Sequence, residues 1–263
     1  MSSGFARSGL VSPGSSSRAG DRVDEAALAV RGLWCTYGRG TGDEKAVLRG
    51  IDFDLEDGEI TALLGRSGSG KSTLALCLAF LEVPDRGSIR LRGSAVDFTQ
   101  RRLLVRARRK VQLVMQDPAR SISPYFTVRQ ALIEPMIAGR ESKKEQQGKI
   151  RRLLAQVGLP DSILAMTARH LSGGQAQRLA LARALATDPE VLILDESFSG
   201  LDLSLQARWV NLVLELVESQ GLTCLLITHD ENLARQLAGR RVRLVDGQIV
   251  AEGQIVAEDR GAP

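Results

Sequence analysis

Two short segments of the chain contain continuous apolar runs, residues 59–64 (EITALL) and residues 191–196 (VLILDE). A strand with one wet face alternates apolar and polar residues, whereas a run of this kind is typical of a strand buried on both faces of a parallel sheet. After the first run, residues 65–72 (GRSGSGKS) interrupt the apolar pattern, and the segment that follows has helical composition. This order of strand, glycine-rich loop and helix predicts an α/β protein.

A second pattern, in residues 204–219, has the period of an α-helix. The apolar side chains that recur at 3.6-residue spacing are Trp209, Leu212, Val213 and Leu216. We predict that this stripe packs in the core and is not a binding surface. The basic run at residues 101–110 (RRLLVRARRK) lacks the interleaved aromatic residues that stack on bases. We interpret it as a solvated helix face, with nucleic-acid binding as the alternative.

Residues 1–24 differ in composition from the rest of the chain. They are rich in Ser, Gly and Arg and have no hydrophobic period, so we expect a disordered tail, with a transit peptide as the alternative. We expect one ordered domain over residues 25–256 and a second tail over residues 257–263. No apolar run approaches the roughly 18–20 residues that span a bilayer. Any membrane role should therefore come through a partner.

Charge and cysteine content change this picture little. The net charge is +4 and the pI about 9.2, which is a weak hint of nucleic-acid binding. The three cysteines, Cys35, Cys77 and Cys224, lie far apart and form no CxxC motif. We interpret them as buried thiols of a protein in a reducing compartment, with a metal or disulfide role as the alternative.

The glycine-rich loop fits the pattern G-x-x-x-x-G-K-[ST]. In such a loop the backbone N–H groups surround a phosphate and the N-terminus of the next helix adds its positive dipole end. Lys71 should reach the outer phosphates and the Ser72 hydroxyl should bind Mg²⁺. We therefore expect a nucleoside triphosphate here, against the alternative of a flexible turn with a surface lysine. The residues expected to surround it are Gly65, Arg66, Ser67, Gly68, Ser69, Gly70, Lys71, Ser72 and Thr73.

The second apolar run ends in two acidic residues, Asp195 and Glu196. Ligands of α/β sheets bind at the carboxyl ends of the strands. We expect Asp195 to hold Mg²⁺, usually through water, and Glu196 to polarise the water that attacks the phosphate. The alternative is a solvated strand end.

Between these two elements lies the motif LSGGQ, which consists of Leu171, Ser172, Gly173, Gly174 and Gln175. With this motif the chain resembles the ATP-binding cassette (ABC) family, and the resemblance covers about residues 27–253. Other positions match family motifs in order: Tyr37 (adenine stacking), Gln116 (metal and attacking water), residues 199–202 with Asp202 (dimer interface) and His229 (γ-phosphate). Taken singly, Tyr37 could be an edge aromatic, His229 a capping group, and Gln116 would carry no meaning.

The resemblance implies a P-loop NTPase fold of ABC type, with a RecA-like core, an antiparallel β subdomain and a helical signature subdomain at about residues 117–180. It also implies that two cassettes bind two ATP molecules between them, head to tail. The helix that begins just after Ser172, Gly173 and Gly174 would then serve the ATP held by the opposing subunit. Glu196, His229 and Gln116 would be the catalytic residues, and Ser72, Gln116 and Asp195 the metal ligands.

Residues 115–128 (MQDPARSISPYFTV) and 201–207 (LDLSLQA) are similar to stretches of importer ATPases for nickel, dipeptides and oligopeptides. Met115, Ser123 and the pair Tyr125–Phe126 depart from that pattern, which leaves the substrate class open among nickel, a metal chelate and a peptide. The resemblance implies a peripheral subunit on the cytoplasmic face of a bacterial inner membrane. Its partners would be two permease subunits, a second ABC ATPase subunit and, indirectly, an extracytoplasmic solute-binding protein, but no nucleic acid.

Two other functions stay open at this stage. A soluble ABC ATPase could remodel an enzyme complex, as in phosphonate breakdown, and an exporter ATPase is the third possibility. The stretch at residues 115–128 disfavours the exporter.

Overall fold

A computed structural model of the chain describes residues 26–38, 40, 43–117, 121–139, 141–198 and 203–254. The two predicted tails lie outside these residues. The strands are β1 (Ala26–Tyr37), β2 (Lys45–Glu56), β3 (Ile60–Leu64), β4 (Arg86–Leu91), β5 (Ser94–Ala95), β6 (Val111–Val114), β7 (Val191–Asp195), β8 (Thr223–Thr228), β9 (Arg240–Val245) and β10 (Gln248–Gln254). The helices are α1 (Lys71–Leu78), α2 (Arg101–Lys110), α3 (Val128–Ala138), α4 (Lys143–Gln156), α5 (Gly173–Leu185), α6 (Leu203–Gln220) and α7 (Glu231–Leu237), with short 3-10 turns at Asp161–Ala165 and Ala168–His170.

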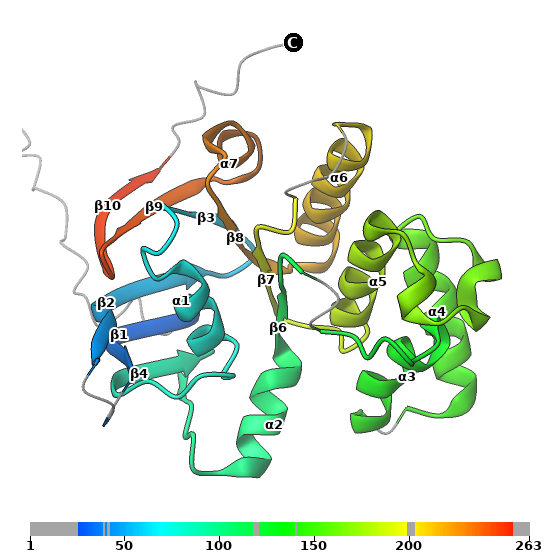
Figure 1. The fold of residues 1–263 in the computed structure, drawn as a ribbon, viewed down its shortest axis with the longest axis horizontal. Coiled ribbons are helices and arrows are strands. Elements are labelled where there is room, and N and C mark those ends of the chain that lie inside the picture. Colours follow the sequence, from blue (N-terminus) through cyan, green and yellow to red (C-terminus); the bar gives the residue numbers. More distant parts are fainter. Residues whose placement is uncertain are drawn as a thin grey trace, which may run out of the picture.

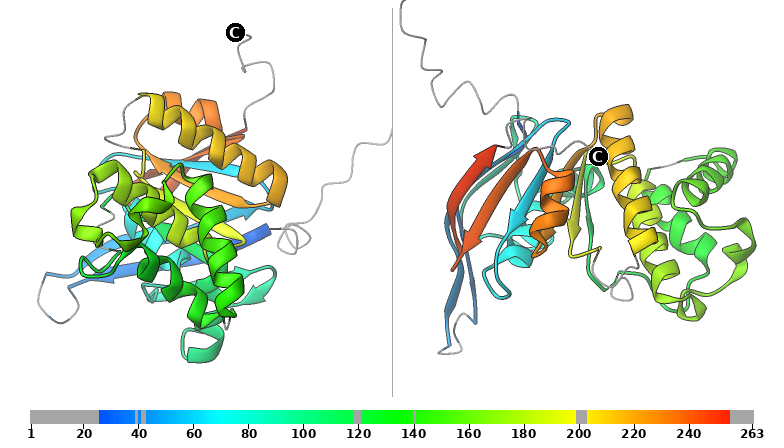
Figure 2. Two further views of the ribbon diagram at one scale, coloured as in Figure 1. Left: turned by 90° about the vertical axis from the view of Figure 1, so that its right-hand side faces the viewer. Right: turned by 90° about the horizontal axis from the view of Figure 1, so that it is seen from above.

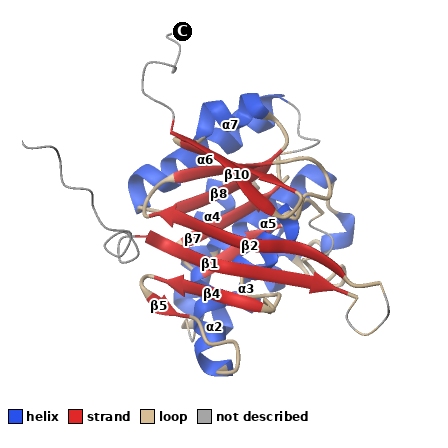
Figure 3. Cartoon of the chain, turned by 90° about the vertical axis from the view of Figure 1, so that its left-hand side faces the viewer, coloured by secondary structure: helices blue, strands red, loops and turns tan. Residues whose placement is uncertain are grey.

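The described strands form two sheets. One is antiparallel, with the order β2-β1-β4-β5, and lies in front of the other in Figure 3. The second has the order β10-β9-β3-β8-β7-β6, in which the five strands from β9 to β6 run parallel. Because these strands run parallel, the loops that follow β3, β8, β7 and β6 all emerge at one edge of the sheet.

The strands β3 and β7 are buried on both faces, as the two apolar runs predict, and β8 between them is buried as well. Alternate residues face two different cores. Leu63, Ile193 and Ile227 pack with α1 and the antiparallel sheet, whereas Leu64, Leu194 and Leu226 pack with the helices on the other side. Helix α1 therefore lies between the two sheets (Figure 1), and its residues Leu74, Ala75, Cys77 and Leu78 hold it in the core.

Helices α3, α4 and α5 form a layer beside the parallel strands, on the side away from the antiparallel sheet (Figures 1 and 2). Each helix begins with a capping box, in which a Ser or Thr hydroxyl accepts a hydrogen bond from the backbone amide three residues later. The three capping residues are Thr127, Ser142 and Ser172. These local signals start the helices before any packing partner is needed.

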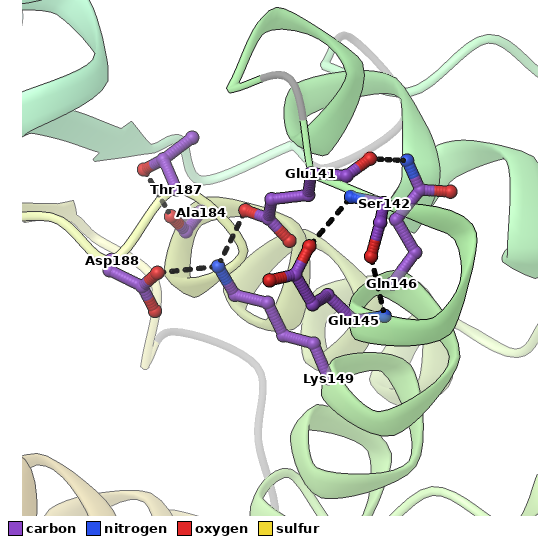
Figure 4. A network of polar contacts seen from close by, with 8 residues as sticks. All are labelled: Glu141, Ser142, Glu145, Gln146, Lys149, Ala184, Thr187 and Asp188. Atoms are coloured by element: carbon purple, nitrogen blue, oxygen red, sulfur yellow. Dashed lines mark hydrogen bonds and ion pairs between the residues drawn. The ribbon is translucent and has the colours of Figure 1, made fainter.

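A nearly buried lysine connects this helical layer to the strand that carries the acidic pair. Lys149 of α4 is 7% exposed, and its ammonium lies 3.0 Å from Glu141 Oε1 and 2.5 Å from Asp188 Oδ2 (Figure 4). Asp188 adopts a positive φ of 49° in the turn that leads into β7. The lysine thus ties α4 to the N-terminal end of that strand.

The predicted core stripe and the predicted buried thiols are confirmed. Trp209, Leu212, Val213 and Leu216 of α6 are all buried. The three cysteines are buried free thiols, and burial raises the pKa of Cys224 to about 12.

Residues 101–110 form α2, as expected. The helix buries Leu104 and Ala107 and exposes most of its basic residues. None of the helices in the described part of the chain is long and apolar enough to cross a membrane.

Candidate functional site

The glycine-rich loop connects the end of β3 to the start of α1. Gly70 precedes the helix with a φ of 108°, a left-handed conformation that only glycine adopts without strain. The side chain of Lys71 is buried and turns back over the loop, where its ammonium donates to Gly65 O at 2.8 Å and to Arg66 O at 3.0 Å. The sequence therefore forms the predicted strand–loop–helix, with the lysine inside the loop.

The glycines of the loop are required because the backbone packs closely against two other strands. A Cβ on Gly65 would lie 2.5 Å from Leu244 O of β9, and one on Gly70 would lie 2.9 Å from Val47 O of β2. At its tip, by contrast, Arg66, Ser67 and Gly68 are exposed. The buried hydroxyl of Ser69 has no hydrogen-bond partner within the described residues. An anion that accepts hydrogen bonds fits such a cradle.

Asp195 lies beside the first turn of α1. Its carboxyl is buried, and desolvation raises its pKa, while a hydrogen bond from Ser72 and the charge of Lys71 lower the pKa and the neighbouring Glu196 raises it. A buried carboxylate next to a second carboxylate is stabilised by a cation, and carboxylate and hydroxyl oxygens are ligands that Mg²⁺ prefers. The residues present here therefore fit a magnesium ion.

Glu196 follows Asp195 in a left-handed conformation, with a φ of 48°. Its amide donates to Ile227 O of β8 at 3.0 Å, and its Oε1 lies 3.4 Å from Nδ1 of His229. The register of β7 and β8 pairs Asp195 with Ile227, so both side chains emerge from neighbouring strands at one edge of the sheet. Gln116 emerges at the same edge, two residues after β6.

Tyr37, at the end of β1, comes close to the same helix. Its hydroxyl is hydrogen-bonded to the side chain of Thr73, and burial raises its pKa while that hydrogen bond lowers it. The ring is 39% exposed. Tyr37 is thus an aromatic side chain that borders the loop and has a free surface.

The LSGGQ motif lies elsewhere in the chain. Ser172 caps α5, and its Oγ accepts from Gln175 N at 3.3 Å while Gln175 Oε1 accepts from Ser172 N at 3.0 Å. The helix begins at Gly173, two residues earlier than the sequence predicts, because this capping box starts it directly after Ser172. Helices α1 and α5 lie on opposite sides of β6 and β7, so this chain does not bring the motif to its own loop (Figures 1 and 2). Leu171 directly precedes the cap, and Asp202 lies outside the described residues.

Comparison with known proteins decides the family. Residues 48–199 match the family described as ABC transporter. The chain belongs to the ABC transporter family. Among curated relatives, the nickel import ATP-binding protein NikE of Escherichia coli K12 and that of Shigella sonnei are each 44% identical over 236 residues, which cover 88% of this chain and 88% of the relative.

Solved ABC structures share the fold. A dimeric structure of the bacterial ABC transporter cassette MJ0796 superimposes with a TM-score of 0.80 at 28% identity, covering 86% of this chain and 98% of that one. CbiO1 of Clostridium perfringens, part of the ABC transporter complex CbiONQ, gives a TM-score of 0.75 at 26% identity over 88% and 89% of the two chains. The predicted ABC fold class is therefore confirmed, and this chain is a nucleotide-binding ABC ATPase.

One contact in this ABC site is not predicted by the sequence. The hydroxyl of Ser197, the residue after Glu196, is buried and donates to Val114 O of β6 at 2.9 Å. Nothing in the local sequence signals this bond, because Val114 lies 83 residues away.

Proposed function

We propose that this chain hydrolyses ATP to drive import of nickel through a membrane permease. The observation that carries the proposal is 44% identity to NikE over 88% of both chains. The similarity to CbiO1, part of a transporter complex, supports a transport role over remodelling of a soluble enzyme complex. A metal chelate or a peptide is the second candidate substrate, because residues 115–128 are similar to importer ATPases for nickel, dipeptides and oligopeptides alike.

The loop geometry supports ATP binding with defined roles for its residues. The backbone amides of residues 65–73 surround the β- and γ-phosphates, and Lys71 leaves its two loop carbonyls to pair with them. Tyr37 stacks on the adenine with its exposed face. Binding thus uses parts of the chain that the fold already holds in place.

Ser72, Gln116 and Asp195 would hold Mg²⁺. When bound, the ion neutralises phosphate charge. On this side of the site, Asp195 lies next to Ser72 in a buried setting that favours a cation. Glu196 orients and polarises the attacking water, and His229 contacts the γ-phosphate from the neighbouring strand.

The position of the LSGGQ motif supports ATP hydrolysis by a dimer of this chain with a second ABC ATPase subunit. Ser172, Gly173 and Gly174 form an exposed or half-exposed helix start that is remote from the chain's own loop, so they serve the ATP of a second ABC ATPase subunit. The similarity to a dimeric cassette structure supports this arrangement. Leu171 and Gln175 fix the helix start, and Asp202 would belong to the same interface.

The surface for the permease is proposed on the helical side, in the subdomain of about residues 117–180. Tyr125 is 76% exposed and Ile137 is 64% exposed, so both offer apolar surface that a partner could bury. The chain would be peripheral, on the cytoplasmic face of a bacterial cell membrane. It would meet an extracytoplasmic solute-binding protein only through the permease.

The test uses the variant Glu196→Gln, which should bind ATP and dimerise but hydrolyse poorly. The tagged variant is purified with ATP from detergent-solubilised membranes, and the co-purifying proteins are identified. Two permease proteins and a second ABC ATPase are the expected result. Soluble enzymes or nucleic acid without any membrane protein would overturn the transport proposal. Uptake of radioactive nickel by cells that express the wild type or Lys71→Ala then tests the substrate, because peptide uptake alone would overturn nickel.

A further inference from the structure

The turn that carries Glu196 is held from both neighbouring strands. On one side, the amide of Glu196 donates to Ile227 O of β8 at 3.0 Å. On the other side, the hydroxyl of Ser197 donates to Val114 O of β6 at 2.9 Å. Because Glu196 takes a left-handed φ of 48°, the chain leaves the line of β7 at this residue. The Ser197 hydroxyl then makes the contact to β6 after the regular ladder has ended at Val114 and Leu194.

The contact is built into the interior of the protein. Ser197 is 1% exposed, and its hydroxyl also lies 3.4 Å from Asp195 O. The next residue, Phe198, packs edge-on against Trp209 of α6 with ring centroids 5.7 Å apart. The chain before and after Ser197 is thus held in place, so the hydroxyl stays in position to donate to Val114 O.

Val114 is the last residue of β6, and Gln116 follows two residues later. The hydroxyl of Ser197 therefore joins the two loops that carry Glu196 and Gln116. In the proposed function Glu196 polarises the attacking water, and Gln116 binds the metal ion and contacts the same water. A displacement of about 1 Å in such a pair can lower the rate of the chemical step by about 10²-fold.

We propose that Ser197 is a positioning residue for ATP hydrolysis, which fixes the Glu196 carboxylate relative to Gln116 through its hydrogen bond to Val114 O. The inference rests on the proposed roles of Glu196 and Gln116. Ser197 is 1% exposed and its hydroxyl is bonded to Val114 O, so its role would be indirect. Its removal should therefore change turnover and leave ATP binding unchanged.

The test compares Ser197→Ala with Thr187→Val in the reconstituted transporter. Thr187 is a matched control, because its buried hydroxyl also donates to a backbone carbonyl, Ala184 O at 3.1 Å, but at the far end of β7. Both variants should lower the melting temperature by similar amounts. Only Ser197→Ala should lower kcat, by about ten-fold, with the KM for ATP changed less than about two-fold.

A double-mutant cycle with Gln116→Ala tests the route of the effect. If Ser197 acts by aligning Glu196 with Gln116, the loss caused by Ser197→Ala should largely disappear in the Gln116→Ala background. An unchanged kcat in Ser197→Ala would overturn the inference, as would a loss that is additive with Gln116→Ala. A parallel rise in KM and fall in melting temperature beyond that of Thr187→Val would also overturn it.

The variant Glu196→Gln separates this result from the proposed function. If Glu196→Gln turns over ATP at the wild-type rate, the proposed role of Glu196 fails, whatever Ser197→Ala does. If Glu196→Gln is inactive and Ser197→Ala is fully active, the catalytic assignment stands and only the positioning role of Ser197 is wrong.

Discussion

Nδ1 of His229 lies 3.4 Å from Oε1 of Glu196, although the two residues are 33 positions apart. Each follows the last residue of a parallel strand, and the strands β7 and β8 are direct neighbours. The histidine is largely exposed and the glutamate is partly buried. The two side chains are therefore adjacent at the sheet edge, with the histidine on the solvent side.

This relationship predicts a loss of turnover in His229→Ala. Removing a side chain that orients the reacting groups should lower kcat for ATP hydrolysis by about 10²-fold, with ATP binding retained. The measurement is phosphate release at saturating ATP, with nucleotide affinity measured by titration. His170 is the only other histidine, and its ring contacts Thr167 away from this edge. His170→Ala should hydrolyse ATP at the wild-type rate, and equal losses in the two variants would contradict the assignment.

The buried carboxyl of Asp195 predicts an increase in stability when its charge is removed. Because desolvation raises its pKa in the folded state, the ionised form is less favourable there than in the unfolded chain. Stability should therefore fall as the pH rises from the unfolded pKa of 3.8 through the raised folded value. Without nucleotide at neutral pH, Asp195→Asn should melt at a higher temperature than the wild type, and the difference should shrink at acidic pH.

The same variant should lose ATP hydrolysis, because the amide is a weaker ligand for Mg²⁺. Thermal melts with and without magnesium and ATP provide the check, since only the wild type should gain stability from the metal. The exposed Asp161 offers a matched control, and Asp161→Asn should change stability by less than about 0.5 kcal/mol. A melting temperature of Asp195→Asn equal to or below that of the wild type at neutral pH would contradict the predicted gain in stability.

Substitutions at two glycines of the loop separate the cost of a left-handed backbone from the cost of a steric clash. Gly68 has a φ of 80° with open space around it, so Gly68→Ala should cost about 1–2 kcal/mol of stability from the left-handed backbone alone. Gly70 has a φ of 108°, and its Cβ would lie 2.9 Å from Val47 O, so Gly70→Ala should cost about 3 kcal/mol or more. Denaturant unfolding measures both. Similar costs for the two variants would show that the close approach to β2 carries no energy.

Removal of the Lys149 ammonium should destabilise the join between α4 and the turn before β7. Lys149→Met leaves Glu141 without its cation in a poorly exposed site, at a cost of about 2–3 kcal/mol. Asp188 is 73% exposed, so water can solvate its carboxylate when the lysine is removed, and the cost stays low for a buried pair. Lys144→Met, on the exposed side of the same helix, should cost less than about 0.5 kcal/mol. Equal stability of the two variants by urea unfolding would contradict the role of the cluster.

Local sequence patterns predicted the elements whose causes are local. The apolar runs at β3 and β7 and the stripe through Trp209 each act over a few residues. The start of α5 differed by two residues, since the reciprocal bond between Ser172 and Gln175 tightens the first turn, and β3, β7 and α6 differed from their predicted bounds by one residue at one or both ends.

The sequence by itself determined the glycine loop, the acidic strand end and the LSGGQ helix, because each is set by backbone freedom, burial and capping within one segment. The tertiary structure decided which of them meet. Parallel pairing brings Asp195 to Ser72 and His229 to Glu196, while α5, which Ser172 caps, lies on the other side of the sheet from α1. The tertiary structure also decided two contacts that no sequence pattern predicts, the hydrogen bond from Ser197 to Val114 and the ion pair of Lys149 with Asp188. Strand order and packing select these partners from distant parts of the chain.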